Sequence, residues 1–161
     1  MPTAFWTLVT VALWAVATRC ARRSETVGLE LVIGGEVAVL ALHRVGLAWC
    51  TWEPTAYGFP LPWIGWAGSS LEYTRYVIPW TVDVAFWAAL GLLAARASAP
   101  LGRGRLVVAA ALADPVAVDL RTEHALVYWQ EIEFTHPVDA VVPWDGRYEY
   151  TDPRCPVPPA A

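Results

Sequence analysis

Long apolar stretches alternate with short polar segments along this chain. They predict membrane-spanning helices at about residues 2–19, 27–48, 76–95 and 106–120. A spanning helix needs about 20 mostly apolar residues, because each residue rises about 1.5 Å and the hydrocarbon core is about 30 Å thick. The first stretch carries a charge only at its end and the third carries only Asp83, so both match a spanning helix closely.

The second and fourth stretches match this pattern less well. The fourth has 15 residues between Arg105 and Arg121, which is about 22 Å of helix. It predicts either a short span or a buried or interfacial helix that opens the C-terminal region. The second is long enough, but it contains several ionisable residues: Glu30, Glu36, His43 and Arg44.

The arginines indicate the orientation of the predicted spans. Loops on the cytoplasmic side are enriched in Lys and Arg, and six arginines lie in 19–25 and 96–105. With four spans both segments face the cytoplasm, and the N-terminus, residues 51–75 and the C-terminal region lie outside. With three spans the C-terminal region becomes cytoplasmic. We therefore expect a multi-pass protein of the inner (cell) membrane.

Composition supports lipid as the solvent of this chain. Hydrophobic residues make up 57% and charged residues 16%, against about 45–50% and about 25% in soluble domains. The net charge of −4 argues against a nucleic-acid partner. The predicted fold is an all-α bundle of four transmembrane helices, or alternatively three, over residues 1–120. An extended, proline-rich extramembrane tail follows over residues 121–161.

Aromatic residues crowd the predicted outer loop, 49–80, among glycines and prolines. The pattern is typical of an aromatic belt at the headgroup level; the alternative is a structured lid or re-entrant loop. Within it, Gly58–Trp63 reads as an extended docking strip, because each proline restricts the residue before it. A GFPxPW-like loop followed by an apolar span with an early Asp resembles small, uncharacterised multi-pass bacterial membrane proteins over residues 57–95, a resemblance that implies no function.

Ionisable residues at membrane depth are functional candidates by default, since each costs about 2.5–3.5 kcal/mol or more at the centre of a span. Glu36 and His43 lie seven residues apart on nearly one helix face, and Asp83 falls between them in depth if spans two and three are antiparallel neighbours. They could form a proton or cation path. Alternatively they are interhelical clamps, with Glu36 bonded to Thr7, Thr10 or Thr81, and Asp83 paired with Arg44 or His43.

Further local signals concern helix ends. Asp114-Pro115 either breaks the fourth helix at mid-depth or marks a helix start. Ser69 has capping-box spacing to Glu72 ahead of the third span, which would then pass through Pro79 with a kink. Glu30 is expected to be solvated near the cytoplasmic boundary.

The polar C-terminal region predicts a strand within 126–134 and a short hairpin around Asp145-Gly146. A metal site there is a weak alternative, because the acidic residues and histidines match no tight ligand spacing; they are Glu131, Glu133, His136, Asp139 and His124. Cys50 and Cys155 could form a disulfide bond outside, with Cys20 a reduced thiol inside. Aromatic side chains suited to partner binding are Trp63, Trp66, Trp129, Trp144, Tyr148 and Tyr150.

Three classes of function fit these features. The absence of Walker, dinucleotide, GxSxG and HExxH motifs leaves no catalytic constellation to assign. We predict a non-catalytic accessory or scaffolding subunit of a larger membrane complex, with lipid and other membrane subunits as partners. The alternative is a small proton- or cation-coupled transporter or channel that uses Glu36, Asp83 and His43. A membrane enzyme acting on a lipid or quinone has the least support, and no cofactor or substrate can be named.

Overall fold

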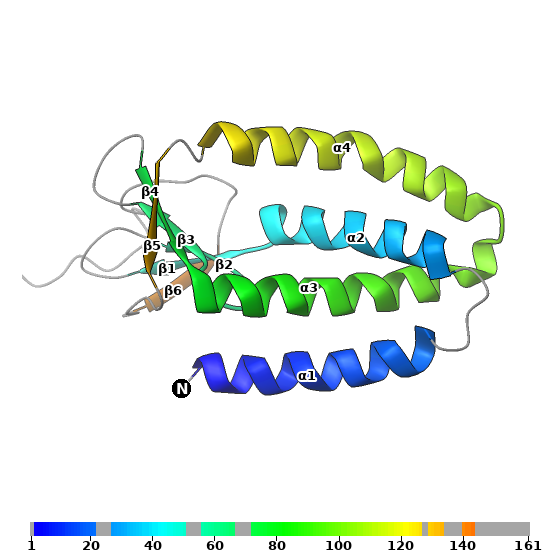
Figure 1. Ribbon diagram of the computed structural model, residues 1–161, viewed down its shortest axis with the longest axis horizontal. Helices are drawn as coiled ribbons and strands as arrows, with labels where there is room; N and C mark the ends of the chain where they lie inside the picture. Colours follow the sequence, from blue (N-terminus) through cyan, green and yellow to red (C-terminus); the bar gives the residue numbers. More distant parts are fainter. Residues whose placement is uncertain are drawn as a thin grey trace, which may run out of the picture.

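The computed structural model describes residues 2–21, 27–50, 56–66, 72–126, 129–133 and 140–143. Four helices lie side by side, and a small sheet lies at one end of them (Figure 1). The chain is therefore mostly helical but not all-α, which corrects the predicted fold class. The helices are α1 (Pro2–Ala21), α2 (Val27–Arg44), α3 (Val77–Ala97) and α4 (Gly104–Leu126), with a short 3-10 helix, η1 (Ala99–Leu101), before α4.

The sheet joins two parts of the chain that are far apart in sequence. Its antiparallel centre is formed between α2 and α3 by β1 (Leu47–Cys50), β2 (Ala56–Gly58), β3 (Ile64–Trp66) and β4 (Glu72–Tyr76). Two strands that follow α4 complete it: β5 (Trp129–Glu133) pairs parallel to β4, and β6 (Ala140–Pro143) pairs antiparallel to β1. The strand order is β5-β4-β3-β2-β1-β6. Because β4 precedes α3 and β5 follows α4, these two helices run out from the sheet and return to it.

The C-terminal region is thus partly folded, which corrects the expectation of an extended tail. The strand expected within 126–134 is confirmed as β5. The two valines of the expected hairpin lie in β6, which pairs with β1. The other arm of that hairpin, 148–150, lies outside the described residues.

Several helix ends differ from those predicted. The second helix ends at Arg44, and residues 47–50 form β1. Glu72 belongs to β4, and α3 begins at Val77 after Tyr76, which makes no side-chain cap; the predicted capping box is therefore wrong. Pro79 lies in the first turn of α3, where its missing N–H has no intrahelical partner to lose, so no kink is required there.

The fourth helix is longer than predicted and passes through Pro115 without interruption. Both interpretations of Asp114-Pro115, a break at mid-depth and a helix start, are therefore wrong. The missing N–H of Pro115 removes one hydrogen bond from the helix interior.

The helices form an open layer in the order α1-α3-α2-α4 rather than a closed bundle (Figure 1). Within the described part of the chain, extensive contacts join α1 to α3, α3 to α2, and α2 to α4. Two helices are long and apolar enough to cross a membrane, over Thr3–Cys20 and Val77–Ala97. Large apolar side chains are exposed on all four, among them Leu8 (71%), Leu31 (56%), Ile78 (42%) and Val107 (70%).

The central pair of the layer, α2 and α3, crosses at two glycines. A Cβ atom on Gly34 would lie 3.1 Å from the backbone carbon of Gly91, and a Cβ atom on Gly91 would collide with the carbonyl oxygen of Gly34. Small residues at helix crossings allow this close approach, which provides packing where lipid replaces water. Nearby Ala89 and Ala95 of α3 are both fully buried.

We expect Gly91→Ala to destabilise the protein by about 1–3 kcal/mol, because the added methyl group overpacks a backbone contact. In an exposed helix the same change stabilises by about 1 kcal/mol. Gly35→Ala is the matched control, since a Cβ there meets no atom within 4 Å. Thermal unfolding in detergent should show a lower Tm for the first variant only. Equal Tm values for the two variants would contradict this account of the crossing.

Candidate functional site

Asp83 is the buried centre of the candidate site. Its side chain is 0% exposed in α3, and its carboxylate accepts a hydrogen bond from the backbone N–H of Leu61 at 3.0 Å. The other carboxylate oxygen, Oδ2, is buried and has no hydrogen-bond partner within the described residues. The predicted pairing of Asp83 with Arg44 is wrong, because Asp83 instead holds the loop between β2 and β3.

That loop, Gly58–Trp63, is buried between the helices and the sheet. Leu61 is 1% exposed and Trp63 is 2% exposed. Two indole N–H groups hold the loop backbone: Trp87 donates to the carbonyl oxygen of Phe59 at 2.7 Å, and Trp49 to that of Gly58 at 2.9 Å. Gly58 has a φ of +147°, where a Cβ would also collide with the loop.

Aromatic rings fasten the same loop to three helices. The Phe59 ring packs against Trp6 of α1 at 5.6 Å between ring centroids, and against Phe86 and Trp87 of α3 at 6.0 and 5.9 Å. Trp63 lies edge-to-face with His43 of α2 at 6.1 Å. The loop is therefore part of the interior, which corrects its interpretation as a docking strip and argues against a partner contact for Trp63.

The three residues of the predicted path are only partly brought together. If the Gly34–Gly91 crossing is taken as the reference, antiparallel helices place Asp83 level with residue 42, next to His43. Glu36 then lies about 9 Å further from the sheet. The hydroxyls of Thr7 and Thr81, two of its predicted partners, donate to carbonyls of their own helices.

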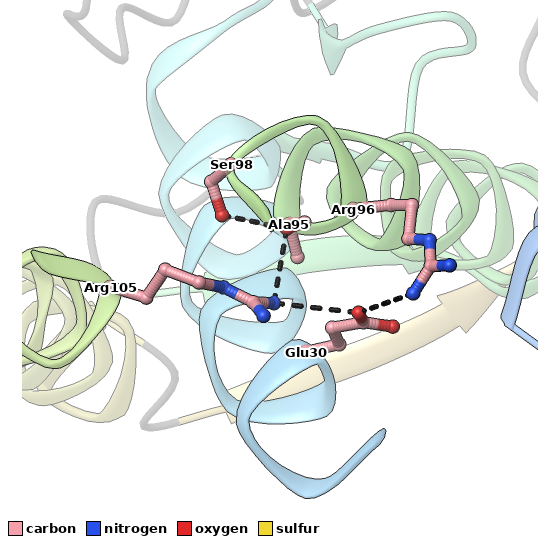
Figure 2. Close-up of polar contacts among 5 residues, drawn as sticks. All are labelled: Glu30, Ala95, Arg96, Ser98 and Arg105. Carbon is pink, nitrogen blue, oxygen red and sulfur yellow. Dashed lines mark hydrogen bonds and ion pairs between the residues drawn. The ribbon is translucent and has the colours of Figure 1, made fainter. Parts of the chain in front are cut away.

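An ion-pair cluster joins three helices at the end of the layer away from the sheet (Figure 2). Glu30 of α2 accepts a hydrogen bond from Arg96 of α3 at 2.9 Å and lies 3.5 Å from Arg105 of α4. Arg105 also donates to the carbonyl oxygen of Ala95 at 3.2 Å. The side chains of Glu30 and Arg105 are both 4% exposed. The expectation that Glu30 is solvated is therefore wrong.

A second ion pair lies at the sheet end of α2 and α4. The guanidinium group of Arg44 makes two hydrogen bonds of 2.8 Å to the carboxylate of Asp119. The two residues are 75 apart in sequence, and so are Glu30 and Arg105. The helices α2 and α4 therefore run parallel with one constant register over about 21 Å.

The polarity of these two pairs specifies the orientation of α4. Along α2 a carboxylate comes first and a guanidinium second, whereas along α4 the order is reversed. An antiparallel α4 would bring like charges together at both ends, which is destabilising. Asp119 and Arg105 were not among the predicted site residues, and their 14-residue spacing in sequence, matched by Glu30 and Arg44, is the signal that could have identified them.

The remaining predicted residues lie elsewhere or outside the described part. Asp114 is exposed on α4. Cys50 is disulfide-bonded and Cys20 is a free thiol; Cys155, the predicted partner of Cys50, lies outside the described residues. The side chains of Trp66 and Trp129 are not described, nor are Trp144, Tyr148 and Tyr150. The same holds for the side chains of the weak metal-site alternative: His124, Glu131, Glu133, His136 and Asp139. Within the described side chains no cluster suited to a metal ion occurs.

Comparison with known proteins gives no further assignment. No family model, no curated protein and no solved structure matches this chain.

Proposed function

We propose that this chain is a non-catalytic accessory or scaffolding subunit of a membrane protein complex. The main observation behind the proposal is that the ionisable residues of the helices make structural contacts. Asp83 holds a loop, Glu30 holds three helices together, and Arg44 fixes the register of α4. Groups with these structural contacts stabilise a fold, which supports a scaffolding role for the chain.

The proposal includes membrane insertion with four crossings. The apolar helices α1 and α3 support it by length and composition. The pairing of β4 with β5 brings the chain back to the same side after α3 and α4, which supports an even number of crossings between them. The end of the layer away from the sheet holds the last turns of α1 and α3 and the start of α4 (Figure 1). Arg19 and Arg96 lie in those last turns and Arg103 directly precedes α4, so the positive-inside rule favours a cytoplasmic position for that end.

The open arrangement of the helices favours assembly with other subunits. A closed bundle buries its polar residues internally. This layer instead has two edge helices, α1 and α4. Within the described residues, each of them makes extensive contacts with one neighbouring helix. The sheet, with strands from both halves of the chain, would then form a rigid extramembrane platform at the outer face.

Purification in mild detergent from native membranes tests the proposal. We expect other membrane proteins to co-purify in fixed ratio with the tagged chain. Recovery of the chain alone, or as a pure homo-oligomer, would contradict the accessory role. Truncation at Arg121 is not a suitable test, because it also removes both edge strands of the sheet.

Transport of protons or cations is the second candidate, and one observation favours it. The Glu36 Oε2 and Thr10 Oγ1 atoms are buried and have no hydrogen-bond partner within the described residues. Unsatisfied buried polar groups are costly and need an explanation. In liposomes containing the purified protein, a pH-dependent flux that Glu36→Gln abolishes would favour transport. We expect no such flux, and equal behaviour of Glu36→Gln and the unchanged protein.

A further inference from the structure

We propose that the exposed side of α4 around Asp114 binds a transmembrane helix of a partner subunit, and that this helix carries an Arg or Lys at the depth of Asp114. This inference rests on the accessory role proposed above. It names the binding surface and the chemistry of the partner.

The two sides of α4 differ in burial. The positions that face α2 recur at helical spacing and are buried or half-buried: Arg105, Val108, Leu112, Val116 and Asp119. The positions on the other side are exposed and have the same spacing: Val107, Ala110, Asp114, Ala117 and Arg121. We call this second set the outer face of α4. Its two alanines would allow another helix to approach closely.

Asp114 lies near the middle of the helix layer. The register of 75 residues between α2 and α4 places it level with Val39. The Gly34–Gly91 crossing in turn places Val39 level with Phe86 of α3. Phe86 is within about 2 Å of the midpoint of the apolar helix Val77–Ala97 along its axis. If α3 spans the membrane, Asp114 is therefore close to the centre of the bilayer.

The charge of Asp114 identifies the kind of occupant. Two other ionisable residues of α4, Arg105 and Asp119, point to α2 and are paired there. Asp114 is on the opposite side, and Arg121, the basic residue on the same face, is about 10 Å away along the axis. A carboxylate exposed to hydrocarbon is strongly unfavourable, and membrane helices relieve this by pairing with an opposite charge.

A second copy of this chain is a poorer occupant than a basic partner helix. Two copies with the same orientation in the membrane would be related by an axis along the membrane normal, so their α4 helices would run parallel. The two Asp114 carboxylates would then face each other at the same depth, and like charges at close range repel. A partner helix with an Arg or Lys instead neutralises the carboxylate.

The test combines substitution with site-specific crosslinking in native membranes. A photoreactive amino acid is placed at Ala110 or Ala117 on the outer face of α4, and at Val11 on α1 as the control position, which is 62% exposed. We expect Ala110 and Ala117, but not Val11, to crosslink to one membrane protein, at a helix that carries an Arg or Lys. Asp114→Asn should lower recovery of that protein at least tenfold, and Asp114→Glu, which keeps the charge, should retain it.

Each other outcome has a defined meaning. A crosslink to a second copy, or to a helix without a basic residue, would overturn the inference. If a partner co-purifies in fixed ratio but Asp114→Asn does not change its recovery, the outer face of α4 is not its binding surface, while the accessory role stands. If no protein co-purifies at all, the proposed function itself fails.

Discussion

Replacing Asp83 by alanine is expected to destabilise the protein by about 2–5 kcal/mol, because it removes the acceptor of a fully buried backbone N–H. A buried donor without a partner costs about 1–3 kcal/mol, and more when its partner was charged. The donor is the amide of Leu61, in a loop that is shielded from water at this point, since Leu61 is 1% exposed. Thermal unfolding in detergent measures the effect as a large fall in Tm.

The part of the structure that loosens first distinguishes loss of the contact between Asp83 and the loop from general destabilisation of the protein. Loss of the Asp83 contact should first release the loop, so Trp87 and Trp49 lose their carbonyl partners and tryptophan fluorescence shifts at temperatures below the main transition. Thr81→Ala is the matched control, because Thr81 is exposed on the same helix and its hydroxyl donates only to a carbonyl oxygen of that helix. If Asp83→Ala unfolds at the same temperature as the control, Asp83 does not anchor the loop.

Glu30→Gln is expected to destabilise the protein by about 3–5 kcal/mol. Removing one partner of a buried ion pair leaves an uncompensated buried charge, and this costs more than the pair itself contributes. The charge left behind is that of Arg105, whose side chain is 4% exposed. Arg96 is 32% exposed and can be solvated instead. Chemical or thermal unfolding in detergent gives the difference.

Arg44→Gln provides the contrast on the same pair of helices. Its ion pair with Asp119 is bidentate, but the Arg44 side chain is 54% exposed, so its loss should change the Tm far less than Glu30→Gln does. The double variant Glu30→Gln with Arg105→Met should recover at least half of the loss caused by Glu30→Gln, because it also removes the buried guanidinium charge that Glu30 neutralises. Lack of recovery would mean that Glu30 acts through a contact other than Arg105.

The helices were predictable because their signal is local. Runs of apolar residues of sufficient length predict helices whatever their neighbours are, and the four runs correspond to α1–α4. Their ends were less predictable, since they depend on tertiary contacts. Trp49, for example, belongs to an apolar run but forms part of β1, where its indole reaches the carbonyl of Gly58.

The sheet was missed because its pairing is non-local. β5 and β6 follow α4, yet they pair with β4 and β1, from which whole helices separate them in sequence. The short strands β2 and β3 also lack the alternation that marks a strand, because residues in both are buried on either side. The segment Gly58–Trp63 contains two prolines and has no regular periodicity. From sequence alone it was therefore interpreted as an extended strip.

The candidate residues illustrate the same limit. Composition and spacing predicted Asp83 as a carboxylate at membrane depth, but the partners of such a group depend on which loop folds back onto it. Glu30 was assigned to the solvent because it lies near a helix end. Its burial depends on Arg96 and Arg105, which come from two other helices and could not be placed without the fold.

The position of β5 and β6 at the two edges of the sheet has a consequence for how the chain is made. On the ribosome, β1–β4 emerge first, and the outer strands β1 and β4 lack their partners β6 and β5 until the segment after α4 has been synthesised. If the helices cross a membrane as proposed, β5 and β6 reach these strands only when α4 returns the chain to the same compartment. Completion of the sheet would therefore report correct insertion, and a chain with α4 wrongly inserted would keep two open strand edges that proteases and chaperones can recognise.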